Sequence, residues 1–208
     1  MGSRIMHLSI AQVINNKHGF GNDFLIGSIT PDVNKNSRTP KELTHFMVKR
    51  EDGEHDMFPN MFLEEYGTCL NTFQLGYYLH LISDDIWLKT VYKKYILENM
   101  SYSKDEALRR FYLDFHYYNG ILIKQYKLVI LKNNKYLSTG VNEIIDRDIS
   151  EIIEDLDADF DDMSIEDFPG LLKKEDVEQY INVCVKEFEI FLLKGSYDGV
   201  KFVFYNGF

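Results

Sequence analysis

The stretch that decides the fold runs from residue 70 to residue 87 and reads LNTFQLGYYLHLISDDIW. Its apolar residues recur at the spacing of an α-helix, which would be largely buried. His80 and Asp84 stand four residues apart in it, so a helix places both side chains on one face. Because the neighbouring residues are apolar, a charged pair at this position needs something to neutralise it. The stretch therefore predicts a helix that carries a buried polar pair.

The rest of the chain shows the same helical spacing, and it contains only four prolines. We expect one all-α domain over residues 1–208, a compact multi-helix bundle with little or no sheet. Residues 33–56 are polar and predict a long loop, and the aromatic tail 200–208 could dock as an extended segment. Ser103 and Glu106 have the spacing of a capping box. The predicted helices cover 4–15, 60–66, 70–87, 88–99, 103–118, 121–131, 142–156 and 173–194, with a short apolar turn at 23–27.

Composition limits the classes of function. The formal net charge of -10 argues against non-specific binding to nucleic acids and against attraction to anionic membranes. The sequence has neither a signal-peptide pattern nor an apolar run of about 18 residues, so we expect a soluble, cytoplasmic protein without stable membrane anchoring. Its two cysteines, Cys69 and Cys184, are too few and too far apart for a disulfide framework or a Cys-x-x-Cys metal site.

Several histidines and aspartates could act together as metal ligands. Zinc binds histidine nitrogen and carboxylate oxygen, and helices of a bundle can bring such ligands together in its core. A zinc-bound water has its pKa lowered to about 7 and can attack an ester, and two metals can clamp both oxygens of a phosphate ester. The candidate ligands are His7, Asp32, His45, His80 and Asp84.

Each candidate also has a structural interpretation. His80 could be a core histidine with a satisfied hydrogen bond, and Asp84 a surface acid. Asp32 follows Pro31 and could open a turn, because aspartate side chains bond to nearby backbone. His45 could lie near a helix start in an exposed loop, and His7 could be a partly buried residue of the first helix. Spacing alone leaves the metal and structural interpretations about equally supported.

Four motifs in this order resemble the zinc-dependent phospholipase C family. They are His7-Leu8-x-Ile10, Leu25-Ile26-Gly27-Ser28-Ile29-x-Pro31-Asp32, His45-Phe46 and Leu75-Gly76-Tyr77-Tyr78-Leu79-His80-x-x-x-Asp84, within residues 4–90. That family is all-α, and its zinc cluster hydrolyses phosphodiesters such as phospholipid head groups. The resemblance implies that Asp32, His45, His80 and Asp84 hold one zinc. It also implies that Asp84 bridges towards a second zinc, bound by His7.

The chain departs from this family at several points. It begins with Met1, whereas the secreted enzymes have a free N-terminal tryptophan after processing. Thr90 stands where the family has a further histidine, and no later His-x-x-x-Glu pair occurs. We therefore expect fewer metals than in the phospholipases: one zinc, with a second at His7 and Asp84. Sites of this composition also accept manganese, iron or nickel.

Three other residues could take part in the chemistry. His116 is the only late histidine and could complete or line the site, or simply lie near the end of a helix. Asp85 and Asp114 could hold a ligand histidine by a hydrogen bond or accept a proton, and Asp32 or Asp85 is the expected proton acceptor. The acidic run Asp157-x-Asp159-x-Asp161 opens like a calcium loop but lacks its glycine, so we expect a solvated loop.

These observations leave two functions open. The first is a zinc-dependent hydrolase of phosphate esters, with a small phosphate ester or a lipid head group as substrate. Its catalytic residues would be Asp32, Asp85 and His116. The second is a non-catalytic helical interaction protein whose metal site is structural or lost. Two histidines with two aspartates would be an unusual structural zinc site.

Overall fold

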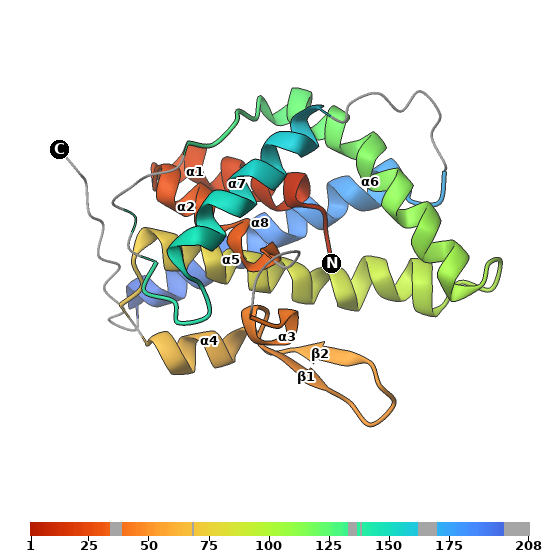
Figure 1. Cartoon of the computed structure of the whole chain (residues 1–208), viewed down its shortest axis with the longest axis horizontal. Helices are drawn as coiled ribbons and strands as arrows, with labels where there is room; N and C mark the ends of the chain where they lie inside the picture. The colour runs from red at the N-terminus through yellow and green to blue at the C-terminus, as the bar shows by residue number, and fades with distance from the viewer. Residues whose placement is uncertain (34–38, 68, 133–136, 138, 162–169, 198–208) are drawn as a thin grey trace.

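Helices dominate the computed structural model, as the sequence predicts (Figure 1). The structure describes residues 1–33, 39–67, 69–132, 137, 139–161 and 170–197. Within these ranges a short 3₁₀ helix, η1 (Thr30–Asp32), and a π-helix, η2 (Leu88–Leu97), accompany the α-helices. The α-helices are α1 (Arg4–His18), α2 (Asn22–Gly27), α3 (Lys41–Thr44), α4 (Pro59–Tyr66), α5 (Thr72–Trp87), α6 (Lys104–Tyr126), α7 (Asp146–Asp161) and α8 (Lys174–Tyr197).

Helix α5 crosses the middle of the molecule and carries the polar pair (Figure 1). It begins with a capping box: the Asn71 side chain accepts a bond from the Gln74 N–H, and the Gln74 side chain accepts one from the Asn71 N–H. It then passes without a break into η2. The helices predicted at 70–87 and 88–99 are therefore one continuous rod whose second part is π-helical, a rare form often found near functional sites.

Two glycines let α2 lie against α5 at backbone distance. A Cβ atom at Gly27 would lie 2.1 Å from the Phe73 carbonyl oxygen, and one at Gly76 would lie 2.0 Å from the Phe24 carbonyl oxygen. Neither position can hold a larger residue unless the helices move apart. This close crossing brings the chain that follows α2, with Asp32, beside the polar face of α5.

Helix α1 packs against α6, α7 and α8. Ser3 caps its start by accepting a bond from the Met6 N–H, and Gly19 ends it in a left-handed conformation with φ of 70°. The helix predicted at 4–15 is thus confirmed but continues to His18. Arg4 ties α1 to α7, because its guanidinium binds Asp159 at 2.8 Å.

The prediction of a long loop over residues 33–56 is wrong for the part of that range that the structure describes. Residues 39–57 contain α3 and an antiparallel hairpin, β1 (Met47–Lys49) paired with β2 (His55–Met57). Gly53 makes the turn, with φ of 86°, which other residues rarely adopt. Most of the segment is polar because it lies at the surface, although Thr44, His45 and Phe46 are buried. Strands of three residues are too short for an alternating pattern to reveal.

Two further predictions fail on the later helices. The break predicted at Asn119-Gly120 does not exist, because α6 continues to Tyr126 and the Asn119 side chain accepts a bond from the Ser3 hydroxyl. Ser103 caps α6 as predicted, but the Glu106 carboxylate binds Arg109 and Arg110. The helices predicted at 60–66, 142–156 and 173–194 correspond to α4, α7 and α8.

The acidic segment is helical up to residue 161, not the solvated loop that we predicted. Helix α7 includes Asp157 and Asp161, and its Asp155 and Asp159 face Arg4. The remainder of the acidic stretch and the tail 200–208 lie outside the described residues. Buried apolar side chains of the described elements form one connected cluster, and none of these helices is long and apolar enough to cross a membrane.

Candidate metal centre

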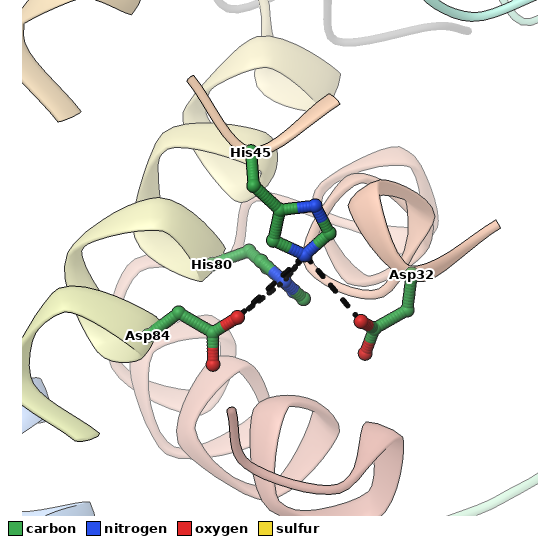
Figure 2. A group of neighbouring side chains, drawn as sticks. All are labelled: Asp32, His45, His80 and Asp84. Carbon is green, nitrogen blue, oxygen red and sulfur yellow. Dashed lines mark hydrogen bonds and ion pairs between the residues drawn. The ribbon is translucent and has the colours of Figure 1, made fainter. Parts of the chain in front are cut away.

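Four side chains from three segments meet beside α5 (Figure 2). Asp32 ends η1, His45 follows α3, and His80 and Asp84 lie one turn apart on α5. One nitrogen or oxygen of each residue lies within 4.8 Å of those of the other three. The structure thus brings together four of the five predicted ligands, and these four, called here the metal group, could hold a metal ion.

The spacing of the donor atoms in the metal group suits a tetrahedral ion. The Nε2 atoms of His45 and His80 are 3.3 Å apart. The Asp84 Oδ2 atom lies 3.4 Å from the His80 Nε2 and 3.6 Å from the His45 Nε2, and the Asp32 Oδ1 atom lies 3.5 Å from the His45 Nε2. Ligands at about 2.0–2.2 Å from a tetrahedral zinc are roughly 3.3–3.6 Å from one another. These four distances therefore match the edges of such a coordination shell.

Backbone carbonyl groups fix which ring nitrogen of each histidine faces the centre. The His80 Nδ1 atom lies 2.8 Å from the Ser28 carbonyl oxygen, and the His45 Nδ1 atom lies 3.1 Å from the Lys41 carbonyl oxygen. A carbonyl oxygen only accepts, so each Nδ1 carries a proton and donates it. Each Nε2 of a neutral ring then points a lone pair at the centre. This is the arrangement that metal-binding histidines use.

The segment of His45 is held in place by Thr44 and Tyr77. The Tyr77 hydroxyl donates to the Thr44 carbonyl oxygen at 2.6 Å, which ties the end of α3 to α5. The Thr44 hydroxyl lies 3.0 Å from the Pro31 carbonyl oxygen, which ties α3 to η1. Because all these groups are buried, the loop that carries His45 is fixed by hydrogen bonds on both sides.

The metal group has an excess of acceptors that the protein itself does not satisfy. The Asp84 Oδ1 atom accepts a bond from the Gly2 N–H at 3.1 Å, but the Oδ2 atom is buried and has no hydrogen-bond partner within the described parts of the chain. It faces two imidazole lone pairs and lies near a second carboxylate. Such atoms repel one another at about 3.5 Å unless a proton or a cation lies among them. The donor set therefore fits a bound cation.

The charges of the metal group depend strongly on one another. Burial would raise the pKa of Asp84, but His7 and His80 hold it well below its usual range. Burial would raise the pKa of Asp32 as well, but His80 and His45 lower it. Burial lowers the pKa of His45, whereas the carboxylates of Asp32 and Asp84 outweigh burial at His80 and raise its pKa. Of the two ligand histidines, His80 is therefore the one whose surroundings favour its protonated form.

His7, the fifth predicted ligand, lies on the other side of Asp84. Its Nε2 atom is 3.1 Å from the Asp84 Oδ1 atom, and its ring stacks on His80 with centroids 3.9 Å apart. Burial and the neighbouring His80 lower the pKa of His7 against the effect of Asp84, and its Nδ1 atom has no hydrogen-bond partner in the described structure. The structure thus places His7 beside the metal group without making it one of the four converging ligands.

The other predicted site residues lie elsewhere. Asp85 points away from Asp84 and pairs with Lys89 at 2.6 Å. His116 lies on α6 and interacts electrostatically with Asp159 of α7. Asp114 cannot hold a ligand histidine, because its carboxylate accepts the backbone N–H bonds of residues 170–172. The carbonyl oxygens of Ser28 and Lys41 hold the histidines instead, and backbone acceptors leave no signal in a sequence.

A groove lies between the hairpin and η2, and its lining includes none of the four residues of the metal group. It has a volume of about 780 Å³, and Met1, Met47, Phe58, Asp85 and Tyr92 are among its lining residues. Asp85 is adjacent in sequence to Asp84 and also lines a neighbouring hollow of about 490 Å³. The predicted proton acceptor Asp85 therefore lines a concave surface, but the four residues of the metal group do not.

Sequence reasoning missed Lys41. Its Nζ atom lies 3.9 Å from the Asp32 Oδ1 atom, and the side chain is partly exposed. Its carbonyl oxygen also orients His45, as described above. A lysine in a polar surface segment is too common to stand out in a sequence.

Comparison of the chain with protein-family models, curated proteins and solved structures finds no match. The functional argument therefore depends on the geometry and chemistry of the metal group.

Proposed function

We propose that this protein is a zinc-dependent hydrolase of phosphate esters that uses a metal-activated water. The observation that supports this proposal is the metal group itself. The metal group brings four acceptor atoms within 4.8 Å of one another, and the four distances of 3.3–3.6 Å among them match the edges of a tetrahedral shell. The buried Asp84 Oδ2 atom has no other hydrogen-bond partner in the described structure. Two nitrogens and two carboxylate oxygens suit zinc, and they also admit manganese, iron or nickel.

Zinc bound there would lower the pKa of a water ligand to about 7 and polarise a phosphoryl oxygen. The chain supplies the other parts. The Asp32 side chain is 11% exposed, whereas His45, His80 and Asp84 are fully buried, so solvent and substrate reach the group from the side of Asp32. The carboxylate of Asp32 stays ionised, because His80 and His45 lower its pKa against the effect of burial. It lies at the exposed side of the metal group, where it can orient a metal-bound water.

Lys41 and the groove suit an anionic ester. The Lys41 ammonium lies beside Asp32 at the exposed side of the metal group, where it can pair with a phosphate oxygen. The groove next to Asp85 offers apolar walls from Met47 and Phe58 for the rest of the substrate. A soluble phosphodiester and a lipid head group both meet these requirements. The motif resemblance to the zinc-dependent phospholipases supports this reaction class.

The burial of three of the four ligands favours a second candidate function. A closed shell of four protein ligands is typical of structural zinc, and such metals stabilise a fold without catalysis. In that case the protein would be a helical interaction protein. The partial exposure of Asp32 and the nearby Lys41 ammonium favour the hydrolase.

Metal analysis followed by an esterase assay separates the two functions. We expect the purified protein to bind zinc near stoichiometry and to hydrolyse a bis-aryl phosphodiester or an aryl phosphomonoester. We expect His80→Ala to abolish turnover. Bound metal with loss of fold in chelator and no hydrolysis of either ester would instead support the structural function. Protein that binds no metal and is equally stable in chelator would contradict both.

A further inference from the structure

The groove between the hairpin and η2 continues into the neighbouring hollow and is rich in methionine. The groove and the hollow share Met57, Phe58, Asp85 and Lys89 in their linings, so they form one concave surface, called here the methionine groove. Four of the seven methionines of the chain line it, namely Met1, Met47, Met57 and Met61. Methionine side chains are flexible and polarisable, and they are concentrated at surfaces that adapt to a partner. The composition of the groove therefore indicates a binding surface.

The π-helical winding of η2 builds one wall of the methionine groove. Leu88, Tyr92 and Leu97 of η2 all line it. In an α-helix with 3.6 residues per turn, Leu97 would follow Leu88 by about two and a half turns and lie on the opposite face. The i→i+5 hydrogen bonds of a π-helix widen each turn to roughly 4.4 residues, so the two leucines lie about two turns apart and on one face. This rare winding therefore adds apolar surface to the wall of the groove.

Apolar side chains that line the methionine groove are exposed to solvent. Phe58 is 44% exposed, Met61 41% and Leu97 52%. Exposed apolar side chains that gather in one place mark an interaction site. The two hollows measure about 780 Å³ and about 490 Å³, together more than the roughly 300–1,000 Å³ of a small-molecule site, so a small ester fills only part of them. The groove therefore has room for a segment of a partner protein.

The charges of the methionine groove favour a basic partner. Its lining carries more carboxylates than basic groups: Glu54, Asp56, Glu64, Asp85 and Glu98 against Arg50, Lys89 and Lys93. Each of the three basic side chains is already paired with one of these carboxylates, at 2.6–3.6 Å. Because the net charge of the chain is also -10, an acidic peptide or an anionic membrane would be repelled.

A helix suits this surface better than an extended strand. The strands β1 and β2 have three residues each, so a strand added at the edge of the hairpin would gain few backbone hydrogen bonds. A helix satisfies its own backbone bonds and buries one apolar face in a groove, with anchor residues at i, i+3, i+4 and i+7. We propose that the methionine groove binds a basic amphipathic helix of a partner protein. This interaction is separate from the metal group, whose four residues do not line the groove.

A model peptide tests this proposal. It has about 18 residues, long enough to form a helix, with leucine at the i, i+3, i+4 and i+7 spacing, lysine elsewhere and a fluorescent label for anisotropy measurements. We expect this peptide to bind the full chain. A peptide of the same composition in scrambled order, and one with glutamate in place of lysine, should each bind at least about tenfold more weakly.

Two exposed residues provide a matched pair of variants. Met61→Lys should weaken binding of the amphipathic peptide at least about tenfold, because it removes an apolar contact and repels the lysines of the peptide. Leu193 is 61% exposed on α8 and does not line the groove, so Leu193→Lys should leave the affinity unchanged. Both side chains are exposed, so the two variants should keep the melting temperature of the parent protein. Zinc affinity should also be the same in Met61→Lys and in the parent protein.

Methionine methyl signals locate the bound peptide. In protein labelled with ¹³C at its methionine methyl groups, the peptide should shift the signals of Met47, Met57 and Met61 and leave that of Met6 unchanged, because Met6 is buried in the core. Replacing each methionine in turn by leucine assigns the signals. Equal affinity for the amphipathic and scrambled peptides, equal effects of the two lysine variants, or unshifted groove signals would overturn the proposal. Binding to phosphatidylcholine vesicles without binding to the peptide would overturn it as well, and none of these outcomes would affect the proposed function.

Discussion

Asp84 and Asp114 are both fully buried aspartates on long helices, but their surroundings differ completely. Asp114 accepts three backbone N–H bonds from the segment before α8, at 2.6–3.1 Å, so the fold satisfies both of its oxygens. The Asp84 Oδ2 atom has no such donor and faces His45 and His80. Burial alone therefore does not indicate function; a buried carboxylate that the fold leaves unsatisfied does.

The pKa values of Asp114 and Asp84 differ for the same reason. Burial raises the pKa of Asp114, although its three backbone donors oppose the rise. Burial acts in the same direction at Asp84, but the charges of His7 and His80 outweigh it and lower the pKa. Asp114 thus joins two parts of the chain, whereas the charge of Asp84 is available for an ion.

Replacing each aspartate by asparagine should give the largest contrast. Asp84→Asn removes a charged metal ligand, so zinc affinity should fall by more than the roughly 100-fold that the loss of an outer partner can cause. Asp114→Asn should leave zinc affinity unchanged. Equilibrium dialysis against zinc measures both variants. Similar losses of zinc affinity in the two variants would show that Asp84 and Asp114 do not have different roles.

Stability should show the opposite contrast. Asp114→Ala leaves three backbone N–H groups without their acceptor, so the free energy of unfolding should fall by about 2–4 kcal/mol. The loss should be the same in zinc and in chelator, because Asp114 is not part of the metal group. Denaturant titrations under both conditions measure it. A loss seen only with zinc would place Asp114 in the metal centre after all.

The buried histidines should change the pH dependence of the stability of the metal-free protein near pH 6.5, the ordinary pKa of histidine. Above this pH, folded His80 retains a proton that the unfolded chain has lost, because its pKa is raised, so the contribution of His80 to stability falls as the pH rises. The amino group of Met1 acts in the opposite direction up to about pH 8, because burial lowers its pKa. Below it, unfolded His7 and His45 take up protons that the folded protein excludes, because their pKa values are lowered, so falling pH also lowers stability.

Zinc should remove the loss of stability at high pH, because the ion replaces the proton on His80. Denaturation midpoints from about pH 5 to about pH 8, in chelator and in zinc, test both statements. A difference between the midpoints in zinc and in chelator that does not widen from about pH 6.5 to about pH 8 would show that His80 does not hold a proton in the metal-free fold.

A smaller effect is expected for Tyr77→Phe. It removes the 2.6 Å bond to the Thr44 carbonyl oxygen that fixes the segment of His45, so zinc affinity should fall by about 10-fold while the four ligands remain. Tyr118→Phe, which breaks the bond to Leu172 far from His45 in the sequence, is its control. Equal zinc affinity in the two variants would show that the Tyr77 bond does not position His45.

The sequence predicts those features that depend on spacing within one segment. His80 and Asp84 share a helix face, and the long helices repeat apolar residues, so both follow from periodicity. The convergence of Asp32 and His45 was implied by the order of the motifs, and its physical cause is the close contact of Gly27 and Gly76 with the opposite backbone. Helical spacing alone does not reveal such a contact.

Features that depend on long-range contacts could not be predicted. Gly120 would break an isolated helix, but α6 continues because its residues pack against the rest of the fold. The backbone acceptors of His45 and His80 have no sequence signature.

Anomalous diffraction at the zinc edge, from crystals of the zinc-loaded protein, tests the central claim most directly. The account predicts a strong peak bonded to the Nε2 atoms of His45 and His80, to Asp32 and to the Asp84 Oδ2 atom. A peak elsewhere with none at this position, or ordered side chains around a water at full zinc saturation, would contradict it.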